Sequence, residues 1–116
     1  MTADLDRTLS ALADPVRRAV IDLLQREPHR SSELAVALAQ SRPSMSRHLG
    51  VLRRAGLVQE VPETDPDADA RVRSYELRRE PFTQLRGWLE RVESLWSAEL
   101  VEFKRHVESR TKHRPG

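Results

Sequence analysis

The sequence has no cysteine, which excludes a disulfide framework and any thiolate metal site. Its four histidines are therefore the only soft metal ligands. No stretch approaches the roughly 18 apolar residues that a membrane span requires. Residues 1–10 contain Asp4 and Asp6 and have no continuous apolar core, so a signal peptide is not expected. These absences predict a cytoplasmic protein that does not enter a membrane.

The chain is short and rich in charge. Of its 116 residues, 33% are charged and 38% are apolar, so a modest core is possible while much of the surface stays solvated. Domains usually contain about 100 to 150 residues. We therefore expect one domain over residues 1–110, followed by a polar tail over 111–116. A domain of this size often needs a partner chain to bury part of its apolar surface.

Charge is segregated along the chain even though the net charge is only +2. Residues 17–54 contain eight arginines against three acidic residues, a balance of +5, whereas residues 56–70 contain five acidic residues and no lysine or arginine. Arginine suits forked contacts to phosphate or guanine. A run of charge is also typical of ordinary solvated surface, so its position on the predicted elements must decide between the two interpretations.

Four short helices are predicted before residue 57. The second starts at Pro15, with Asp14 as its N-cap, and ends near Pro28. The third is capped by Ser31 or Ser32, and the fourth spans 41–56 and ends on a glycine, a typical C-terminal cap. The first is marked by leucines at helical spacing: Leu5, Leu9 and Leu12.

The pattern changes after residue 56. Residues 57–61 and 71–77 are short β-branched or aromatic-containing runs separated by a loop over 62–70, which predicts a two-stranded hairpin. A last helix begins at Pro81 and carries apolar residues at spacings of three or four: Phe82, Leu85, Leu89, Val92, Trp96, Leu100, Phe103 and Val107. The predicted fold is mainly α with a small β-hairpin, in the order α-α-α-α-β-β-α. This is a winged helix-turn-helix, a fold that places its recognition helix in the DNA major groove.

Three segments of the helical region are distinctive: LADPVRRAVIDLL (12–24), SELAVAL (32–38) and SRPSMSRHLGVLRRAGLV (41–58). Together they resemble the ArsR/SmtB family of bacterial transcriptional repressors. The resemblance covers nearly the whole chain and implies a homodimer that binds a pseudo-palindromic operator. Many relatives sense metals through a Cys-x-Cys pair in the third helix, where this chain has Ala35 and Ala37. We therefore expect neither that metal site nor a cofactor.

The helix over 41–56 carries most of the expected DNA contacts. Met45, Leu49 and Leu52 share one stripe and must face the core, so at about 100° per residue Arg47 lies on the opposite face. We expect Arg47 to read a base, because a guanidinium donates two hydrogen bonds to guanine O6 and N7. The predicted DNA-contacting residues, including two from the second strand of the wing, are Ser41, Arg42, Ser44, Ser46, Arg47, His48, Gly50, Arg54, Arg71 and Arg73.

Some of these positions leave alternatives open. Glycine inside a helix costs roughly 1 kcal/mol relative to alanine, so Gly50 suggests that another group, such as DNA, approaches closely there. His48 is either packed or in contact with phosphate, and Arg17 and Arg18 are either backbone contacts or solvated surface. The acidic tip of the wing is predicted to be held away from DNA; it consists of Glu63, Asp65, Asp67 and Asp69.

The last helix has more apolar surface than a monomer this small can cover. The resemblance implies that the first and last helices form a symmetric dimer interface. The predicted interface residues are Leu5, Leu9, Leu12, Leu89, Val92, Trp96 and Phe103. The alternative is that both apolar stripes of the last helix wrap a single small core.

The sequence thus predicts a homodimeric repressor that binds specific double-stranded DNA. One alternative is a winged-helix module that binds proteins. Another is a repressor that responds to a metal or other effector at the last helix, where Glu99, Glu102 and His106 lie within reach of one another. An enzyme is not expected, because the chain has no Gly-rich phosphate loop, nucleophile elbow or metal-binding histidine pair. Nothing in the sequence identifies a small-molecule or metal effector.

Overall fold

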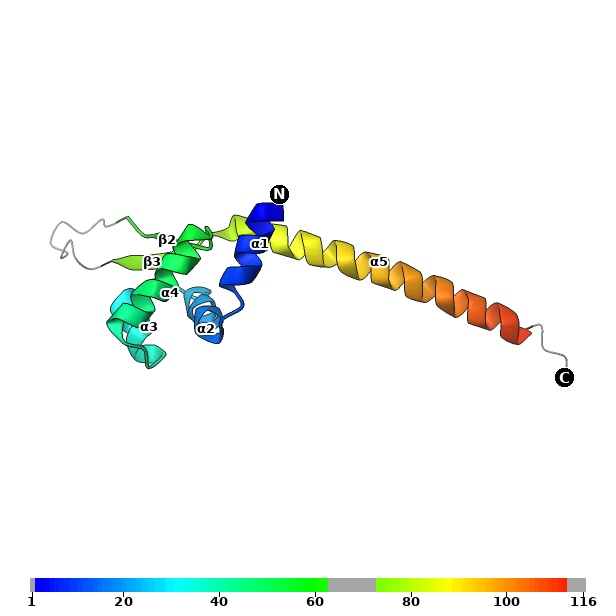
Figure 1. The fold of residues 1–116 in the computed structure, drawn as a ribbon, viewed down its shortest axis with the longest axis horizontal. Coiled ribbons are helices and arrows are strands. Elements are labelled where there is room, and N and C mark those ends of the chain that lie inside the picture. Colours follow the sequence, from blue (N-terminus) through cyan, green and yellow to red (C-terminus); the bar gives the residue numbers. More distant parts are fainter. Residues whose placement is uncertain (1, 63–72, 113–116) are drawn as a thin grey trace. The chain divides into compact units, whose positions relative to one another are not determined.

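The computed structural model describes residues 2–62 and 73–112 (Figure 1). The chain forms two compact units, 1–83 and 84–116. Five helices and three strands are present in the described part: α1 Thr2–Ala11, α2 Pro15–Leu24, β1 His29–Arg30, α3 Ser31–Ala37, α4 Arg42–Arg54, β2 Val58–Glu60, β3 Ser74–Leu77 and α5 Arg79–Lys112. The predicted winged helix-turn-helix is confirmed. The predicted acidic tip, Arg71 and the residues 113–116 of the tail lie outside the described residues.

The prediction of a two-stranded hairpin was wrong in one respect, because the sheet has three strands. The order is β1-β3-β2, with both pairings antiparallel. The added strand pairs His29 with Tyr75 and Arg30 with Ser74. A strand of two residues is too short to show an alternating pattern, and it exists only because β3 lies beside it.

The helix ends follow local chemistry. The Asp14 carboxylate accepts the backbone N–H groups of Val16 and Arg17 at 2.8 and 3.1 Å, which confirms it as the N-cap of α2. Ser41 caps α4 through the Ser44 N–H at 3.2 Å. Beyond the other end of α4 lies Gly56, whose φ of +78° is left-handed, as a C-terminal cap requires.

Two predicted helix starts were wrong. The N-cap of α3 is Arg30, not Ser31 or Ser32, and its backbone N–H donates to the Glu33 carboxylate at 3.3 Å. The last helix begins at Arg79 rather than Pro81, because proline is tolerated throughout the first turn, where its missing N–H has no helical partner.

The turn between α3 and α4 uses an unusual residue. Ala39 has a φ of 52°, in the left-handed region that glycine usually occupies. The N–H groups of Ala39 and Gln40 donate back to the carbonyls of Val36 and Ala35 at 3.3 and 2.8 Å, which closes the end of α3. These two bonds fix the direction in which the chain enters α4.

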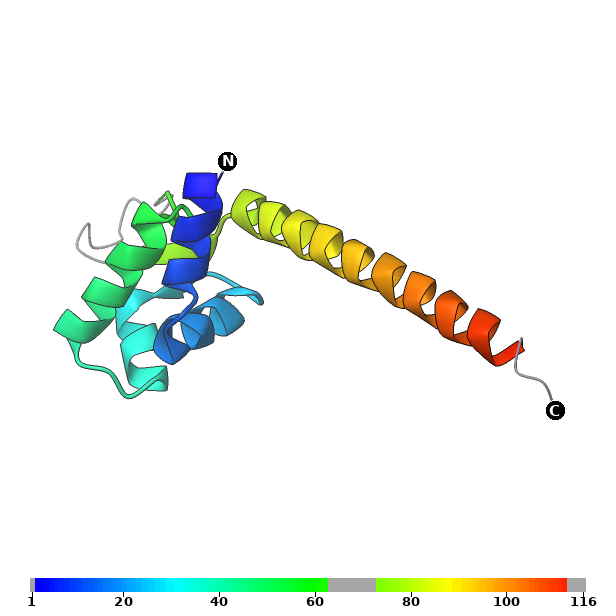
Figure 2. The same cartoon turned by 45° about the vertical axis from the view of Figure 1, so that its right-hand side comes forward.

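The core of the first unit lies between α2, α3, α4 and the sheet (Figure 2). The predicted stripe of α4 is fully inside it: Met45, Leu49 and Leu52 are 1%, 2% and 0% exposed. The stripe packs with Val20, Ile21 and Leu24 of α2, Leu34 and Ala35 of α3, and Leu57, Val58 and Tyr75 from the region of the sheet. Burial of one side of α4 leaves its opposite side facing outward.

Candidate nucleic-acid interface

The outward side of α4 forms a ridge, which we define as Pro43, Arg47, Gly50 and Arg54. Both arginines are exposed, and within the described residues neither makes an ion pair or a side-chain hydrogen bond. The other predicted contacts lie beside this ridge. Ser41, Arg42 and Ser46 are exposed, whereas Ser44 is half-buried, with its hydroxyl donating to the Gln40 side-chain oxygen at 2.7 Å. The ridge therefore offers two free guanidinium groups on one rigid helix.

Gly50 is approached closely by another part of the same helix. A Cβ atom at this position would lie 3.2 Å from Nη1 of Arg54, tighter than most such contacts. The absence of a side chain therefore lets the Arg54 guanidinium fold back along the ridge. The close approach expected at this glycine is made here by Arg54.

One flank of α4 faces α1 and α2. Nδ1 of His48 lies 3.4 Å from Nη1 of Arg17 and 4.0 Å from the Asp14 carboxylate. Arginine only donates, so Nδ1 of His48 is the acceptor in its contact with Arg17. Arg17 also donates to the carbonyls of Ala11 and Ser10 at 2.6 and 3.3 Å. This arginine thus joins the end of α1 to α4 at His48, whose side chain is only 18% exposed.

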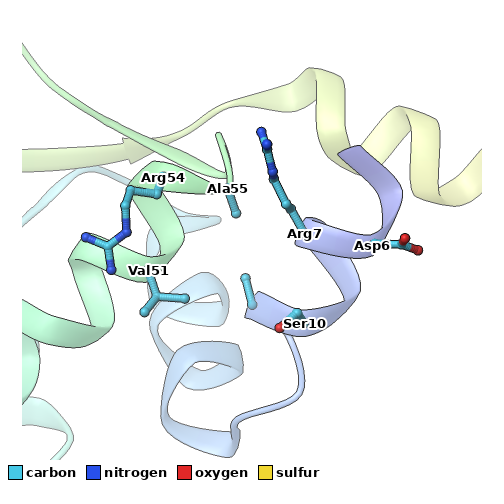
Figure 3. A pocket seen from close by; sticks show the side chains of 7 residues that line it. Asp6, Arg7, Ser10, Val51, Arg54 and Ala55 are labelled. Atoms are coloured by element: carbon cyan, nitrogen blue, oxygen red, sulfur yellow. The ribbon is translucent and has the colours of Figure 1, made fainter. Parts of the chain in front are cut away.

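The same flank also contains an open cleft of about 560 Å³ between α1 and α4 (Figure 3). Its apolar lining includes Val51 and Ala55 of α4. The residues that line it are Asp6, Arg7, Ser10, Ala11, Val51, Arg54 and Ala55. The flank is therefore tied to α1 and α2 at His48 and open to solvent near the end of α4.

The other flank of α4 faces the wing and is tied to it by one carboxylate. Oε1 of Glu60 accepts from Nη1 of Arg53 at 2.9 Å and from Nη1 of Arg73 at 2.7 Å. The hydrogen bond to Glu60 raises the pKa of Arg73, so this guanidinium stays charged. Arg73, one of the predicted DNA contacts, is therefore paired within the protein, although its side chain remains 57% exposed.

A second cleft, which we call the wing cleft, lies between β1, α3, α4 and β3 and has a volume of about 390 Å³. Its lining residues are Arg30, Ser31, Ser32, Arg42, Met45, Ser46 and Arg73. Sequence reasoning missed these residues because Arg30 was counted only within the basic segment 17–54, and Ser31 and Ser32 were considered only as alternative helix caps. The sequence signal that could have found them is a basic residue followed by two serines. This signal becomes informative only once it is known that β1 pairs with β3.

Comparison with known proteins decides the family. Residues 12–61 match the family described as a helix-turn-helix domain. The chain is 38% identical over 104 residues to the HTH-type transcriptional regulator Rv2034 of Mycobacterium tuberculosis, covering 90% of this chain and 89% of the relative. Its fold is similar to that of the ArsR family transcriptional regulator RHA00566, with a TM-score of 0.73, 34% identity, and coverage of 84% and 94% of the two chains. The chain belongs to the ArsR family.

Two further relatives agree with this assignment. An ArsR-like transcriptional regulator from Rhodococcus sp. RHA1 has a TM-score of 0.71 and 28% identity, covering 90% of this chain and 92% of that one. The transcriptional repressor SdpR of Bacillus subtilis is 30% identical over 56 residues, 48% of this chain and 62% of the repressor. This ArsR-family protein is a DNA-binding transcriptional regulator, as predicted, and regulators of this kind are not enzymes.

Over residues 2–62 and 73–112, no three histidine, aspartate or glutamate side chains come together in a group that could hold a metal ion. At the positions of the family's cysteine pair, Ala35 is buried and Ala37 is exposed.

In the same described ranges, no helix combines the length and the apolarity that crossing a bilayer requires.

The cap at Asp14 makes a prediction about pH. The hydrogen bond from the Arg17 N–H, followed by that from Val16 and the nearby His48, holds the pKa of Asp14 below its usual value. A carboxylate with a depressed pKa stabilises the folded state above its unfolded pKa, and this contribution is lost as the pH falls through the folded value. We expect Asp14→Asn to melt at a lower temperature than the wild type above about pH 4, and the two melting temperatures to converge at lower pH.

Thermal denaturation followed by circular dichroism between pH 3 and 7 measures this difference. Asp22→Asn is the matched control, because Asp22 is an exposed residue of the same helix with no capping bond. A difference between wild type and Asp14→Asn that stays constant over the whole pH range would show that the carboxylate charge contributes nothing.

Proposed function

We propose that this ArsR-family regulator is a homodimeric repressor that binds a pseudo-palindromic operator through α4. The observation that carries the proposal is the ridge, where Arg47 and Arg54 are exposed above a fully buried stripe and make no ion pair with any described residue. An exposed helix of this kind fits the major groove, where arginine distinguishes guanine from the other bases. Bound at a promoter, the protein would repress transcription by excluding RNA polymerase. It would act in the cytoplasm, where the DNA lies.

The residues of α4 are assigned either to contacts with DNA or to support of the helix. Arg47 lies at the middle of the ridge and is assigned to base reading, while Ser41, Arg42, Ser46 and Arg54 are assigned to phosphates or neighbouring bases. His48 and Ser44 are held by bonds within the protein and support the helix rather than reading DNA. Gly50 lets Arg54 fold along the ridge.

The dimer is proposed from exposed apolar surface on α1 and α5. Leu9 is 40% exposed on α1, Leu5 of the same helix is half-buried, and so is Leu12, which directly follows the helix. On α5 exposed apolar residues follow one another at spacings of three and four: Leu89, Val92, Trp96, Leu100 and Phe103, at 49%, 47%, 63%, 51% and 68%. Apolar surface of this extent on one helix is typical of an interface between chains. We propose that residues 1–110 act together as a DNA-binding and dimerisation domain.

A dimer sets the geometry of the operator. Two recognition helices related by a two-fold axis contact half-sites about 34 to 36 Å apart, one turn of the double helix. The operator is then an inverted repeat, and fragments of genomic DNA selected by the purified protein will contain it.

The base-reading role of Arg47 is tested on that operator. We expect Arg47→Ala to weaken specific binding by about 1 to 3 kcal/mol and to relax sequence preference, because a bidentate contact to one base is lost. Arg26→Ala is the control, since Arg26 is exposed next to Pro28 and its loss changes the net charge equally. Fluorescence anisotropy with operator and scrambled duplexes measures both constants. Equal losses of operator affinity in the two variants would show that Arg47 does not read a base.

The dimer is tested by sedimentation. We expect the wild type to be a dimer at micromolar concentration and Phe103→Glu to be a monomer, because a buried unpaired carboxylate costs several kcal/mol. Ser94→Glu, on the opposite side of α5 at about 180° from Phe103, should remain a dimer. A monomeric wild type would contradict the proposed dimer. If the protein were instead a winged-helix module that binds proteins, it would bind no DNA duplex even at low salt.

A further inference from the structure

We propose that the wing cleft binds one backbone phosphate of DNA and that Glu60 competes with this phosphate for Arg73. The inference rests on the proposed function, since it requires the ridge of α4 to face DNA. It goes beyond that function by naming a phosphate site outside the recognition helix and a residue that limits affinity.

The chemistry of the wing cleft is suited to a phosphate. Its walls carry three guanidinium groups, from Arg30, Arg42 and Arg73, and three hydroxyl groups, and none of the described residues that line it is acidic. Arginine and serine are common donors to the phosphate oxygens of nucleic acids. The remaining lining residue, Met45, is buried in the core, so the floor of the cleft is fixed.

The position of the cleft indicates that the phosphate belongs to DNA. Arg42 and Ser46 lie one helical turn apart on α4, and each precedes a residue of the ridge, Pro43 or Arg47. A base pair read by Arg47 therefore brings its own sugar-phosphate backbone towards this flank. A free phosphate ion offers the same oxygens, and the experiment below separates the two sources.

Glu60 already occupies one of the three guanidinium groups. Its carboxylate lies 2.7 Å from Nη1 of Arg73, and both side chains remain partly exposed, at 34% for Glu60 and 57% for Arg73. An ion pair at such an exposed position contributes little to stability, so an arriving phosphate is able to take the guanidinium from it. The displaced carboxylate stays within a Debye length of the phosphate and repels it. Glu60 therefore lowers DNA affinity.

The test compares two variants that remove the same charge. We expect Glu60→Gln to bind a generic duplex of about 30 base pairs about 3- to 10-fold more tightly than the wild type at low salt, with a salt slope steeper by up to about 0.9, the value of one added phosphate contact. Glu76→Gln is the control, because Glu76 lies in the same sheet but pairs with Gln59 and does not line the cleft. It should change affinity by less than about twofold, as a general charge effect would.

A second pair of measurements ties the gain to the cleft. Arg30→Gln should weaken binding to all duplexes equally and reduce the salt slope by about 1. In an Arg73→Gln background, Glu60→Gln should give no gain. Melting temperatures of all variants establish that each is folded before binding is measured by fluorescence anisotropy between 50 and 200 mM KCl.

Several outcomes would overturn the inference. Equal gains in Glu60→Gln and Glu76→Gln, or a gain that survives in the Arg73→Gln background, would show that Glu60 does not compete for Arg73 in the cleft. Displacement of DNA by sodium phosphate beyond that caused by KCl of equal ionic strength would assign the cleft to free phosphate instead. A wild type that binds no duplex overturns the proposed function as well, whereas a wild type that binds normally leaves that function intact.

Discussion

Burial of one stripe of α4 is the constraint on which the rest of the structure depends. Met45, Leu49 and Leu52 are almost completely buried, and a change of one such leucine to alanine typically costs about 2 to 5 kcal/mol. Because successive residues of a helix are rotated by about 100°, this burial also decides which residues face outward. The packing of the core therefore also fixes the outward position of Arg47 and Arg54.

The two flanks of α4 differ from its ridge in how their arginine side chains are used within the protein. Arg17 is used to join α1 to His48, and Arg53 and Arg73 share the Glu60 carboxylate. Within the described residues, Arg42, Arg47 and Arg54 have no such partner. The positive charge of the middle of the sequence is thus divided between groups that hold the recognition helix in place and groups that remain available on its surface.

Features encoded locally were predictable from the sequence. The buried stripe of α4 follows from helical periodicity, and the caps at Asp14 and Gly56 follow from side-chain chemistry and backbone freedom at single positions. The outward position of Arg47 then needed no further information. The family resemblance supplied the same fold and the same regulatory class.

Features that depend on distant partners were not predictable. Strand β1 exists because His29 and Arg30 meet β3, more than forty residues later in the chain. The wing cleft needs that pairing to bring Arg30 and Arg73 to one site, and the bond from Arg17 to His48 joins two helices whose spacing is set by the core. No local pattern of apolar or charged residues encodes which of the arginines will find a carboxylate.

The most direct test of the account is to follow every backbone amide while operator DNA is added. In an NMR titration of the isotope-labelled protein at constant salt, the ridge account predicts that the largest chemical-shift changes fall within α4, with a second group at Arg30–Ser32 and Arg73 in the wing cleft. Largest changes along α5, with α4 unperturbed, would contradict the claim that the exposed side of α4 reads DNA.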